Sequence, residues 1–508
     1  MARQHWAPAA AALLALLALA AAGRADQAQT AKALLWGLVN PKTGNVDVQC
    51  DGKDPSKPVV VVCLSDVRSE LDTVKALKEF KSLRSLGISN FTDAGLKALQ
   101  ELEGLQELSL GGPITDKGLK YLKGLKGLKS LELIGTKITD AGLKELKEMQ
   151  GLRTLALVGT PLTDAGLREL KGLKGLQSLD LLGTRLTDAG LKELKEIRTL
   201  QSLDLQHTAV TAGGLKALKE LRGLQSLKLG ADQVSDATLT TLREMGRLYA
   251  LDAAAAKDGK RPSGPADVLT MNLNRTRVTD AGLKELKDFK NLETLYLQST
   301  RVTDAGLKEL KGLKRLQSLD LAGTRITNAG LVELKDLKQL TTLDLGLGVT
   351  DAMLRTLREI GLLHAWEATH ARGDKRPTKV AEVTWLDLQG TAVTDVGLKE
   401  LKELKNLQTL NLVCTAVTDV GLKELKELKN LRTLELIHTS VTDAGLRELK
   451  GLKSLRTLDL SETKVTDAGL KELKPLKNLK ELNLYATQVT DAGAKELQAA
   501  LPELRIKR

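Results

Sequence analysis

The strongest constraint on this chain is a 24-residue repeat that runs through most of its 508 residues. Two successive copies read LRTLELIHTSVTDAGLRELKGLKS (431–454) and LRTLDLSETKVTDAGLKELKPLKN (455–478). With the first leucine as position 1, the same frame begins at twelve further residues: Leu128, Leu152, Leu176, Leu200, Leu224, Val268, Leu292, Leu316, Leu340, Val383, Leu407 and Leu479. Degenerate copies begin at Val59, Leu83 and Leu105. Such a period predicts a stack of similar coils that share one continuous core.

Each coil carries the pattern of a short strand followed by a helix. Positions 1, 4 and 6 are apolar, and positions 4 to 6 alternate as in a strand buried on one face. Position 9 is usually threonine, whose hydroxyl can bond backbone groups at the strand exit. Threonine and aspartate at positions 12 and 13 predict a helix cap, and leucines at 16, 19 and 22 form one apolar stripe. Stacking predicts a parallel sheet with strands about 4.8 Å apart, curved with the strands inside because helices are wider.

The pattern resembles leucine-rich repeats, and the VTDAGLKELK segment is most similar to the ribonuclease-inhibitor-like and F-box-associated types. The chain also resembles exported repeat proteins of bacteria. The resemblance implies an α/β fold, a right-handed leucine-rich-repeat solenoid with a curved parallel β-sheet on the concave face and helices on the convex face. Some related repeats are substrate receptors of ubiquitin ligases. That role is not expected here, because no F-box-like helical segment precedes the repeats.

The beginning of the chain has the layout of a secretory signal. Arg3 and His5 precede an apolar stretch at residues 9–22, which small residues and a polar break follow at residues 23–26. Cleavage is expected after Ala25. The apolar stretch is too short for a comfortable transmembrane helix, and no other run approaches that length. We therefore expect an exported protein of the periplasm, the cell envelope or the extracellular space.

Three similar Pro/Gly-rich segments, here called inserts, interrupt the repeat. They are DGKDPSKP at residues 51–58, DGKRPSGP at 258–265 and GDKRPTK at 373–379. The last two lie 115 residues apart, as do LREMG from Leu242 and LREIG from Leu357, which indicates duplication of a larger unit. We expect turns with a flanking strand that project from the stack or kink it, either as joints or as a partner-binding protrusion.

The predicted organisation is one continuous solenoid with a leader. Residues 1–25 form the signal peptide, 26–58 an N-terminal cap with the first insert, and 59–247 the first repeat block. An insertion at 248–267 precedes the second block at 268–361, and another at 362–382 precedes the third block at 383–508.

Candidate binding residues lie at positions predicted to face the concave side (3, 5 and 7) or its rim (8 and 10). Position 5 carries a row of carboxylates, which either share protons and hold a cation or form a solvated acidic ribbon: Asp180, Asp204, Asp320, Asp344, Asp387, Glu435 and Asp459. Position 10 carries arginines that either dock a carboxylate or phosphate group or form a solvated edge: Arg277, Arg301 and Arg325, with Arg275 close by. Large aromatic side chains are candidate interface anchors, or else pack locally: Tyr296, Trp385 and Tyr485.

The three cysteines of the chain raise two further possibilities, a metal or thiol site and a disulfide. Cys414, His438 and Glu462 share position 8 in successive coils, where they could bind a metal or activate the thiol, or form a chance row. Export also makes a disulfide between Cys50 and Cys63 permissible.

Composition limits the remaining classes of function. Lys+Arg minus Asp+Glu is 76 − 64 = +12, a modest excess that is spread along the chain, with glutamate interleaved among the lysines. No aromatic set for stacking bases is present, so nucleic acid is not an expected partner. No HExxH, CxxC or phosphate-binding glycine loop occurs, so we expect no cofactor and no enzyme. The sequence predicts a non-enzymatic scaffold that binds a protein or glycan along its concave sheet. A metal or thiol enzyme using the Cys414 row and a structural envelope protein are the alternatives.

Overall fold

The computed structural model describes residues 27–40, 42–51, 58–371, 373 and 375–508. The expected signal peptide at residues 1–25 and most of the first insert lie outside the described residues. Contacts divide the chain into two compact units, residues 1–233 with 237–252, and residues 234–236 with 253–508. Each unit is described by itself.

Each repeat contributes one short strand to a sheet whose strands follow in chain order. The first unit has a nine-stranded sheet: β1 Asn45–Cys50, β2 Val59–Ser65, β3 Ser85–Ile88, β4 Glu107–Gly111, β5 Ser130–Ile134, β6 Thr154–Ala156, β7 Ser178–Asp180, β8 Ser202–Asp204 and β9 Ser226–Lys228. The second unit has a five-stranded sheet: β10 Ala254–Ala255, β11 Thr270–Asn272, β12 Thr294–Tyr296, β13 Ser318–Asp320 and β14 Thr342–Asp344. It also has a seven-stranded sheet: β15 Thr369–His370, β16 Trp385–Asp387, β17 Thr409–Asn411, β18 Thr433–Glu435, β19 Thr457–Asp459, β20 Glu481–Asn483 and β21 Arg505–Lys507.

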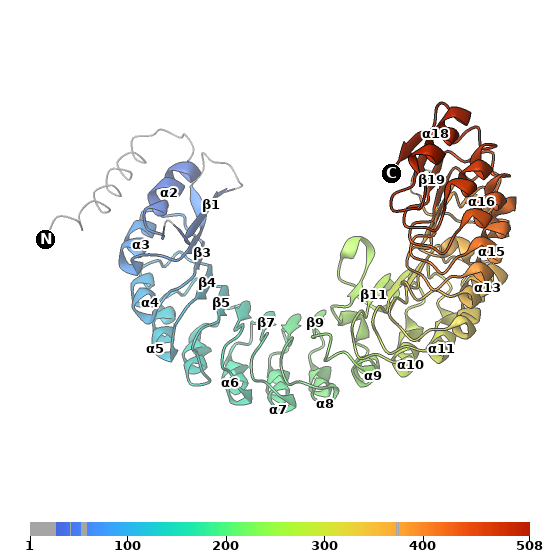
Figure 1. The fold of residues 1–508 in the computed structure, drawn as a ribbon. Coiled ribbons are helices and arrows are strands. Elements are labelled where there is room, and N and C mark those ends of the chain that lie inside the picture. The colour runs from blue at the N-terminus through green and yellow to red at the C-terminus, as the bar shows by residue number, and fades with distance from the viewer. Residues whose placement is uncertain (1–26, 41, 52–57, 372, 374) are drawn as a thin grey trace. The chain divides into compact units, whose positions relative to one another are not determined.

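Helices cover the other side of each stack, as Figure 1 shows within each unit. Most coils contain one α-helical turn that continues as a 3₁₀ turn, for example α11 (Asp304–Leu307) followed by Lys308–Gly312. The remaining α-helices are α2 Gln27–Trp36, α3 Glu70–Leu77, α4 Asp93–Leu99, α5 Asp116–Leu119, α6 Asp164–Glu169, α7 Asp188–Leu191, α8 Ala212–Leu215, α9 Asp236–Glu244, α10 Asp280–Leu283, α12 Asn328–Leu331, α13 Asp351–Glu359, α14 Asp395–Leu398, α15 Asp419–Leu422, α16 Asp443–Leu449, α17 Asp467–Leu470 and α18 Asp491–Ala500. Among the described residues, no helix combines the length and apolar character needed to cross a bilayer.

The local chemistry of one coil explains why strand and helix begin where they do. The Thr300 hydroxyl donates to the Leu297 carbonyl at 2.7 Å, which satisfies a backbone acceptor at the strand exit as the sequence predicted. Thr303 caps α11 by accepting from the Ala305 amide. The leucines at positions 16, 19 and 22 are fully buried: Leu307, Leu310 and Leu313. The predicted α/β leucine-rich-repeat stack is confirmed.

Each sheet begins with an antiparallel pair of strands on either side of an insert. β1 with β2, β10 with β11, and β15 with β16 are antiparallel pairs, whereas the named strands that follow them pair in parallel. In each case a short strand pairs antiparallel with the first strand of the parallel stack that follows. Figure 1 shows the connection that leads into β11 as a loop standing clear of its sheet.

The register of β1 and β2 contradicts the expected disulfide. Cys63 lies opposite Asp47, and Cys50 lies opposite Val59, four residues away along β2. Four residues of strand span about 13 Å, whereas the Cα atoms of a disulfide lie within about 7 Å. Cys50 and Cys63 are not joined to each other.

Candidate functional site

The predicted carboxylate row at position 5 forms a line across each strand face. Asp180 neighbours Asp204, which neighbours Lys228, in the parallel register of β7, β8 and β9. In the second unit, Tyr296, Asp320 and Asp344 are aligned on β12, β13 and β14. On the seven-stranded sheet the row reads Asp387, Asn411, Glu435, Asp459, Asn483 and Lys507. The strands thus hold these side chains one strand spacing apart.

A local hydrogen bond explains why both aspartate and asparagine occur in this row. The Oδ1 atoms of Asp180, Asp320 and Asp387 accept from the backbone amide two residues later, at 3.0, 3.0 and 2.9 Å. Asn411 makes the same contact with Val413 at 2.9 Å. This turn is an ordinary use of an Asp or Asn side chain, and it requires no negative charge.

The charges of the row nevertheless interact. Burial raises the pKa of Asp180, and Asp204 adds to the rise, while the Leu182 amide and Lys228 oppose it. Lys228 Nζ lies 3.5 Å from the buried Asp204 carboxylate. Burial and then Asp344 raise the pKa of Asp320. The row is an electronegative surface, and among the described residues no three potential ligands gather as they would around a metal ion.

The antiparallel pair β15 and β16, which flanks the third insert, forms a pocket of about 330 Å³ with the end of this row at Asp344. We call it the insert pocket and define it by six lining residues: Asp344, Trp366, Glu367, His370, Trp385 and Asp387. The Trp385 ring meets the His370 ring edge-on, with centroids 4.6 Å apart and an interplanar angle of 76°. Leu347 stands at the rim with 71% of its surface exposed.

Carboxylates crowd the insert pocket. Burial raises the pKa of Glu367, and the nearby Asp344 raises it further, while Arg376 opposes both. Arg376 Nη2 lies 2.9 Å from Glu367 Oε1, and Arg376 Nη1 donates to the Glu367 carbonyl at 2.8 Å. Arg376 itself is not part of the lining, which contains three carboxylates and no lysine or arginine.

A second hollow lies on the strand face of the first unit. It has a volume of about 510 Å³ over β1 to β5, and small residues such as Gly87 and Ser109 line it together with Cys63 and Ile134. Burial, followed by the charge of Asp47, raises the pKa of the Cys63 thiol.

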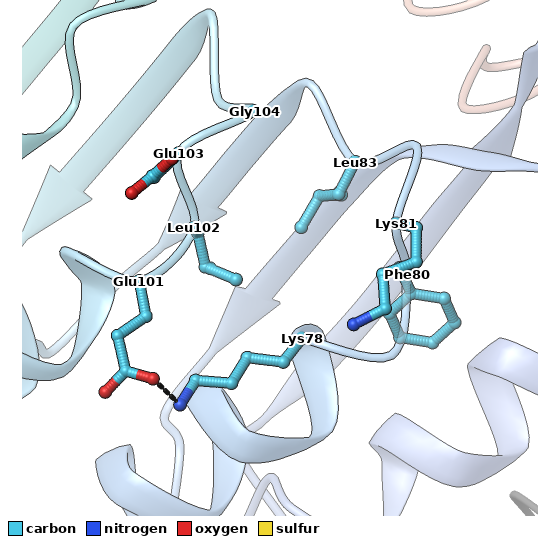
Figure 2. Close-up of a pocket in the computed structure, with 8 residues that line it drawn as sticks. All are labelled: Lys78, Phe80, Lys81, Leu83, Glu101, Leu102, Glu103 and Gly104. Atoms are coloured by element: carbon cyan, nitrogen blue, oxygen red, sulfur yellow. Dashed lines mark hydrogen bonds and ion pairs between the residues drawn. The ribbon is translucent and has the colours of Figure 1, made fainter.

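A third pocket belongs to the repeat itself. A hollow of about 310 Å³ lies between the loops that leave two successive helices. Figure 2 shows the residues that line it, with Lys78 ion-paired to Glu101. The same coil positions line another pocket, from Lys123 to Gly151. A hollow that recurs with the repeat reflects coil geometry, so we assign it no separate role.

The arginine column lies along an exposed edge. Arg277, Arg301 and Arg325 are all exposed, and the backbone amide of each bonds the preceding coil, at 2.9, 3.1 and 3.0 Å. In the described part of the chain, no ion pair involves these three guanidinium groups. Arg275 stands at position 8 with φ of 60°, in the left-handed region.

The aromatic candidates lie apart from one another along the chain. Tyr296 is half-buried on β12 beside Asp320, and Trp385 is half-buried in the insert pocket. Tyr485 follows β20 with 61% of its surface exposed. The strand side therefore presents aromatic side chains at three separate places.

The Cys414, His438 and Glu462 row is only partly assembled. His438 Nδ1 lies 3.2 Å from Glu462 Oε2, and both side chains are exposed. Cys414 Sγ forms no hydrogen bond with His438 within the described residues. All three residues have φ between 54° and 56°, because position 8 is the left-handed turn that glycine occupies in other coils, for example Gly183. The shared turn accounts for their alignment.

Sequence reasoning missed Glu367, His370, Leu347 and Trp366. The 115-residue offset between inserts held the signal, because WEATH at 366–370 stands where LDAAA stands at 251–255. The sequence does not show that β15 pairs antiparallel with β16, so it could not predict that those residues lie beside Asp344 and Trp385.

Comparisons with known proteins agree with this geometry. Five segments match the family described as Leucine Rich repeat: residues 196–219, 290–311, 314–335, 403–426 and 451–474. No curated protein matches the chain.

Three solved structures illustrate the fold-level likeness. An internalin of Listeria monocytogenes is 20% identical, with 87% of this chain and 89% of that chain covered and a TM-score of 0.29. A leucine-rich-repeat protein of Leptospira interrogans is 22% identical, with 85% and 92% covered and a TM-score of 0.35. The plant peptide hormone receptor RGFR1 in complex with RGF2 is 14% identical, with 91% and 93% covered and a TM-score of 0.31. At these scores the likenesses carry no information about function.

Proposed function

We propose that this chain, a leucine-rich-repeat protein, is an exported and non-enzymatic scaffold that recognises a protein partner with the strand side of its repeats. A glycan bound on the same face is the alternative ligand. Repeats of this fold typically mediate recognition between proteins. The pattern of residues 1–25 supports export.

One observation carries the proposal: the side chains that differ from coil to coil gather on the strand side. Core positions repeat leucine almost without change, whereas positions 3, 5 and 7 vary and include Trp385, Asp387 and Tyr485, which are half-buried or exposed. Aromatic side chains beside a pocket are favoured anchors in protein interfaces. The helical side differs, because its lysines pair with glutamates of the next coil, as Lys171 does with Glu193 at 2.5 Å and Lys311 with Glu333 at 2.6 Å.

The enzyme alternative has less support. Its nucleophile, Cys414, is an exposed thiol on a turn and has no hydrogen-bonded base among the described residues. A nucleophile of this kind needs an activating partner within hydrogen-bond reach. The His438–Glu462 contact is solvent-exposed and follows from the repeat spacing.

Affinity capture from envelope and culture fractions tests the proposal. The strand-side variant carries Tyr296→Ala, Arg301→Ala and Trp385→Thr. The matched helical-side variant carries Val396→Ala and Val420→Ala, which replace exposed valines by the alanine of other coils. We expect partners captured by the wild type to be lost by the first variant and kept by the second. Equal capture by all three proteins would contradict the proposal.

A further inference from the structure

We propose that the insert pocket binds the guanidinium group of an arginine side chain presented by a protein partner. The inference rests on the proposed function and names the chemistry that one part of the strand side recognises. A volume of about 330 Å³ is at the small end for ligand pockets, which suits one long side chain better than an extended molecule.

Charge is the first argument. The lining contains Asp344, Glu367 and Asp387, and one nearby cation, Arg376, is already paired with Glu367 at 2.9 Å. The local turns use only Oδ1 of Asp344 and Asp387, which accept from Gly346 and Gln389 at 2.7 and 2.9 Å. A guanidinium group has five donors in a planar fork and pairs well with such carboxylates. A cationic guest would also relieve the repulsion between the acidic groups.

Aromatic rings are the second argument. Trp385 is half-buried and meets His370 edge-on at 4.6 Å, so its indole lines the pocket beside the carboxylates. Trp366, which is 2% exposed, forms a rigid part of the wall. A planar cation is attracted to an indole ring, and arginine makes this contact more often than lysine.

The chain supplies its own comparison for the third argument. β10 pairs with β11 as β15 pairs with β16: Ala255 lies opposite Thr270, and His370 lies opposite Trp385. The residues around the second insert that correspond to Trp366, His370, Trp385 and Asp387 are Leu251, Ala255, Thr270 and Asn272. The same hairpin therefore forms without the imidazole of His370, the indole of Trp385 or the carboxylate of Asp387. We infer that these three groups are present for binding, since the hairpin does not require them.

The comparison also supplies a variant that should fold. The exchange variant carries His370→Ala, Trp385→Thr and Asp387→Asn, each taken from the hairpin of the second insert. Asn at position 5 keeps the local turn, as Asn411 does with Val413. The matched control is Asp180→Asn, which removes the same charge from the same turn in the other unit.

The probe is a dye-labelled acetyl-Gly-Arg-Gly amide, measured by fluorescence anisotropy against the full chain. Its citrulline counterpart has the same shape without the charge, and its lysine counterpart has the charge without the planar fork. We expect the arginine peptide to bind at least about tenfold more tightly than either, the magnitude of a charge-assisted hydrogen bond. The exchange variant should lose about tenfold, Asp387→Asn alone about fivefold, and Asp180→Asn nothing.

Equal binding of arginine and citrulline peptides, or unchanged binding by the exchange variant, would overturn the inference. Equal binding of the lysine peptide would overturn the assignment of a guanidinium group. If the arginine preference is absent while the strand-side variant still loses its captured partners, this inference fails and the proposed function stands.

Discussion

At the residue scale, one aspartate in most coils binds the coil that follows. Asp280 accepts from both the backbone amide and the hydroxyl of Thr303, each at 2.7 Å. A Cβ atom added to Gly306 would lie 2.5 Å from Asp280 Oδ1 and 3.1 Å from Leu283 Cδ1. The recurring TDAG segment therefore has three linked roles. Its threonine caps the helix, its aspartate accepts hydrogen bonds from the next coil, and its glycine leaves space for the aspartate of the preceding coil.

Gly306→Ala should lower the stability of the second unit by about 2 kcal/mol, because overpacking forces the aspartate or the helix to move. The matched control is Gly312→Ala in the same coil, where the nearest atom, Lys290 Nζ, is 3.6 Å away. Chemical denaturation of both variants measures the difference. Similar stabilities would show that the aspartate contact is not tight.

At position 8 of the repeat, a substitution to glycine is expected to raise stability. His438 has φ of 54°, and its contact with Glu462 is exposed. His438→Gly should stabilise the protein by about 0.5 kcal/mol, because relief of the left-handed strain exceeds the added freedom of the unfolded chain. His438→Ala keeps a Cβ and should bring no gain. Thermal midpoints of the two variants check this expectation, and a clear loss with glycine would contradict it.

At the element scale, the sequence predicted the strand and helix of each coil, because the leucine spacing and the Thr-Asp cap act locally. It did not predict that each helix would be one α turn followed by a 3₁₀ turn. It also did not show that inserts add an antiparallel strand, which brings Glu367 and His370 to Trp385 and Asp387. That juxtaposition depends on pairing between distant segments, which no local pattern encodes.

Two glutamates on different elements should have opposite effects on stability. Glu400 is buried against α13, where Arg358 Nε and Arg355 Nε lie 2.7 and 3.1 Å from its oxygens. Burial raises the pKa of Glu400, but these hydrogen bonds outweigh it, and the net pKa is lowered. A lowered pKa contributes stability above the unfolded pKa of about 4.3, and that stability is lost as pH falls. Glu400→Gln should therefore cost about 2 kcal/mol at pH 7 and progressively less as the pH falls through the lowered pKa, as chemical denaturation over a series of acidic pH values would measure. A deficit independent of pH would contradict this expectation.

Glu435 lies on β18 beside Asp459, with Asp387 two strands away. Burial, then Asp459 and Asp387, raise its pKa, so its ionised form disfavours the fold. The protonated form of Glu435 is the one that suits the fold. Its contribution to stability is therefore present below the unfolded pKa and is lost as pH rises through the folded pKa. Glu435→Gln should raise the thermal midpoint at pH 7 by an amount equivalent to about 0.5 kcal/mol, a small effect because water screens the half-exposed row. The gain should vanish near pH 4, and a loss at pH 7 would contradict the expectation.

At the scale of the whole molecule, the residues that maintain the fold and the residues that vary on the surface occupy different positions of the repeat. Leucines, the Thr-Asp-Gly interlock and the ion pairs of the helical side recur in coil after coil, and they account for the fold. The side chains that differ between coils lie on the strand side, and the hairpin of the third insert adds aromatic rings and the Asp387 carboxylate, which the second hairpin lacks. These variable side chains define the surface, and the chemistry, to which we assign recognition of a partner.

Site-specific photo-crosslinking tests this separation most directly. A photoreactive residue replaces either Leu347, 71% exposed on the rim of the insert pocket, or Val420, 59% exposed on the helical side. Both positions are apolar and exposed, so neither substitution should disturb the fold. We expect the partner captured from native fractions to crosslink to position 347 and not to position 420. Crosslinking from position 420 alone, or equally from both, would contradict recognition by the strand side.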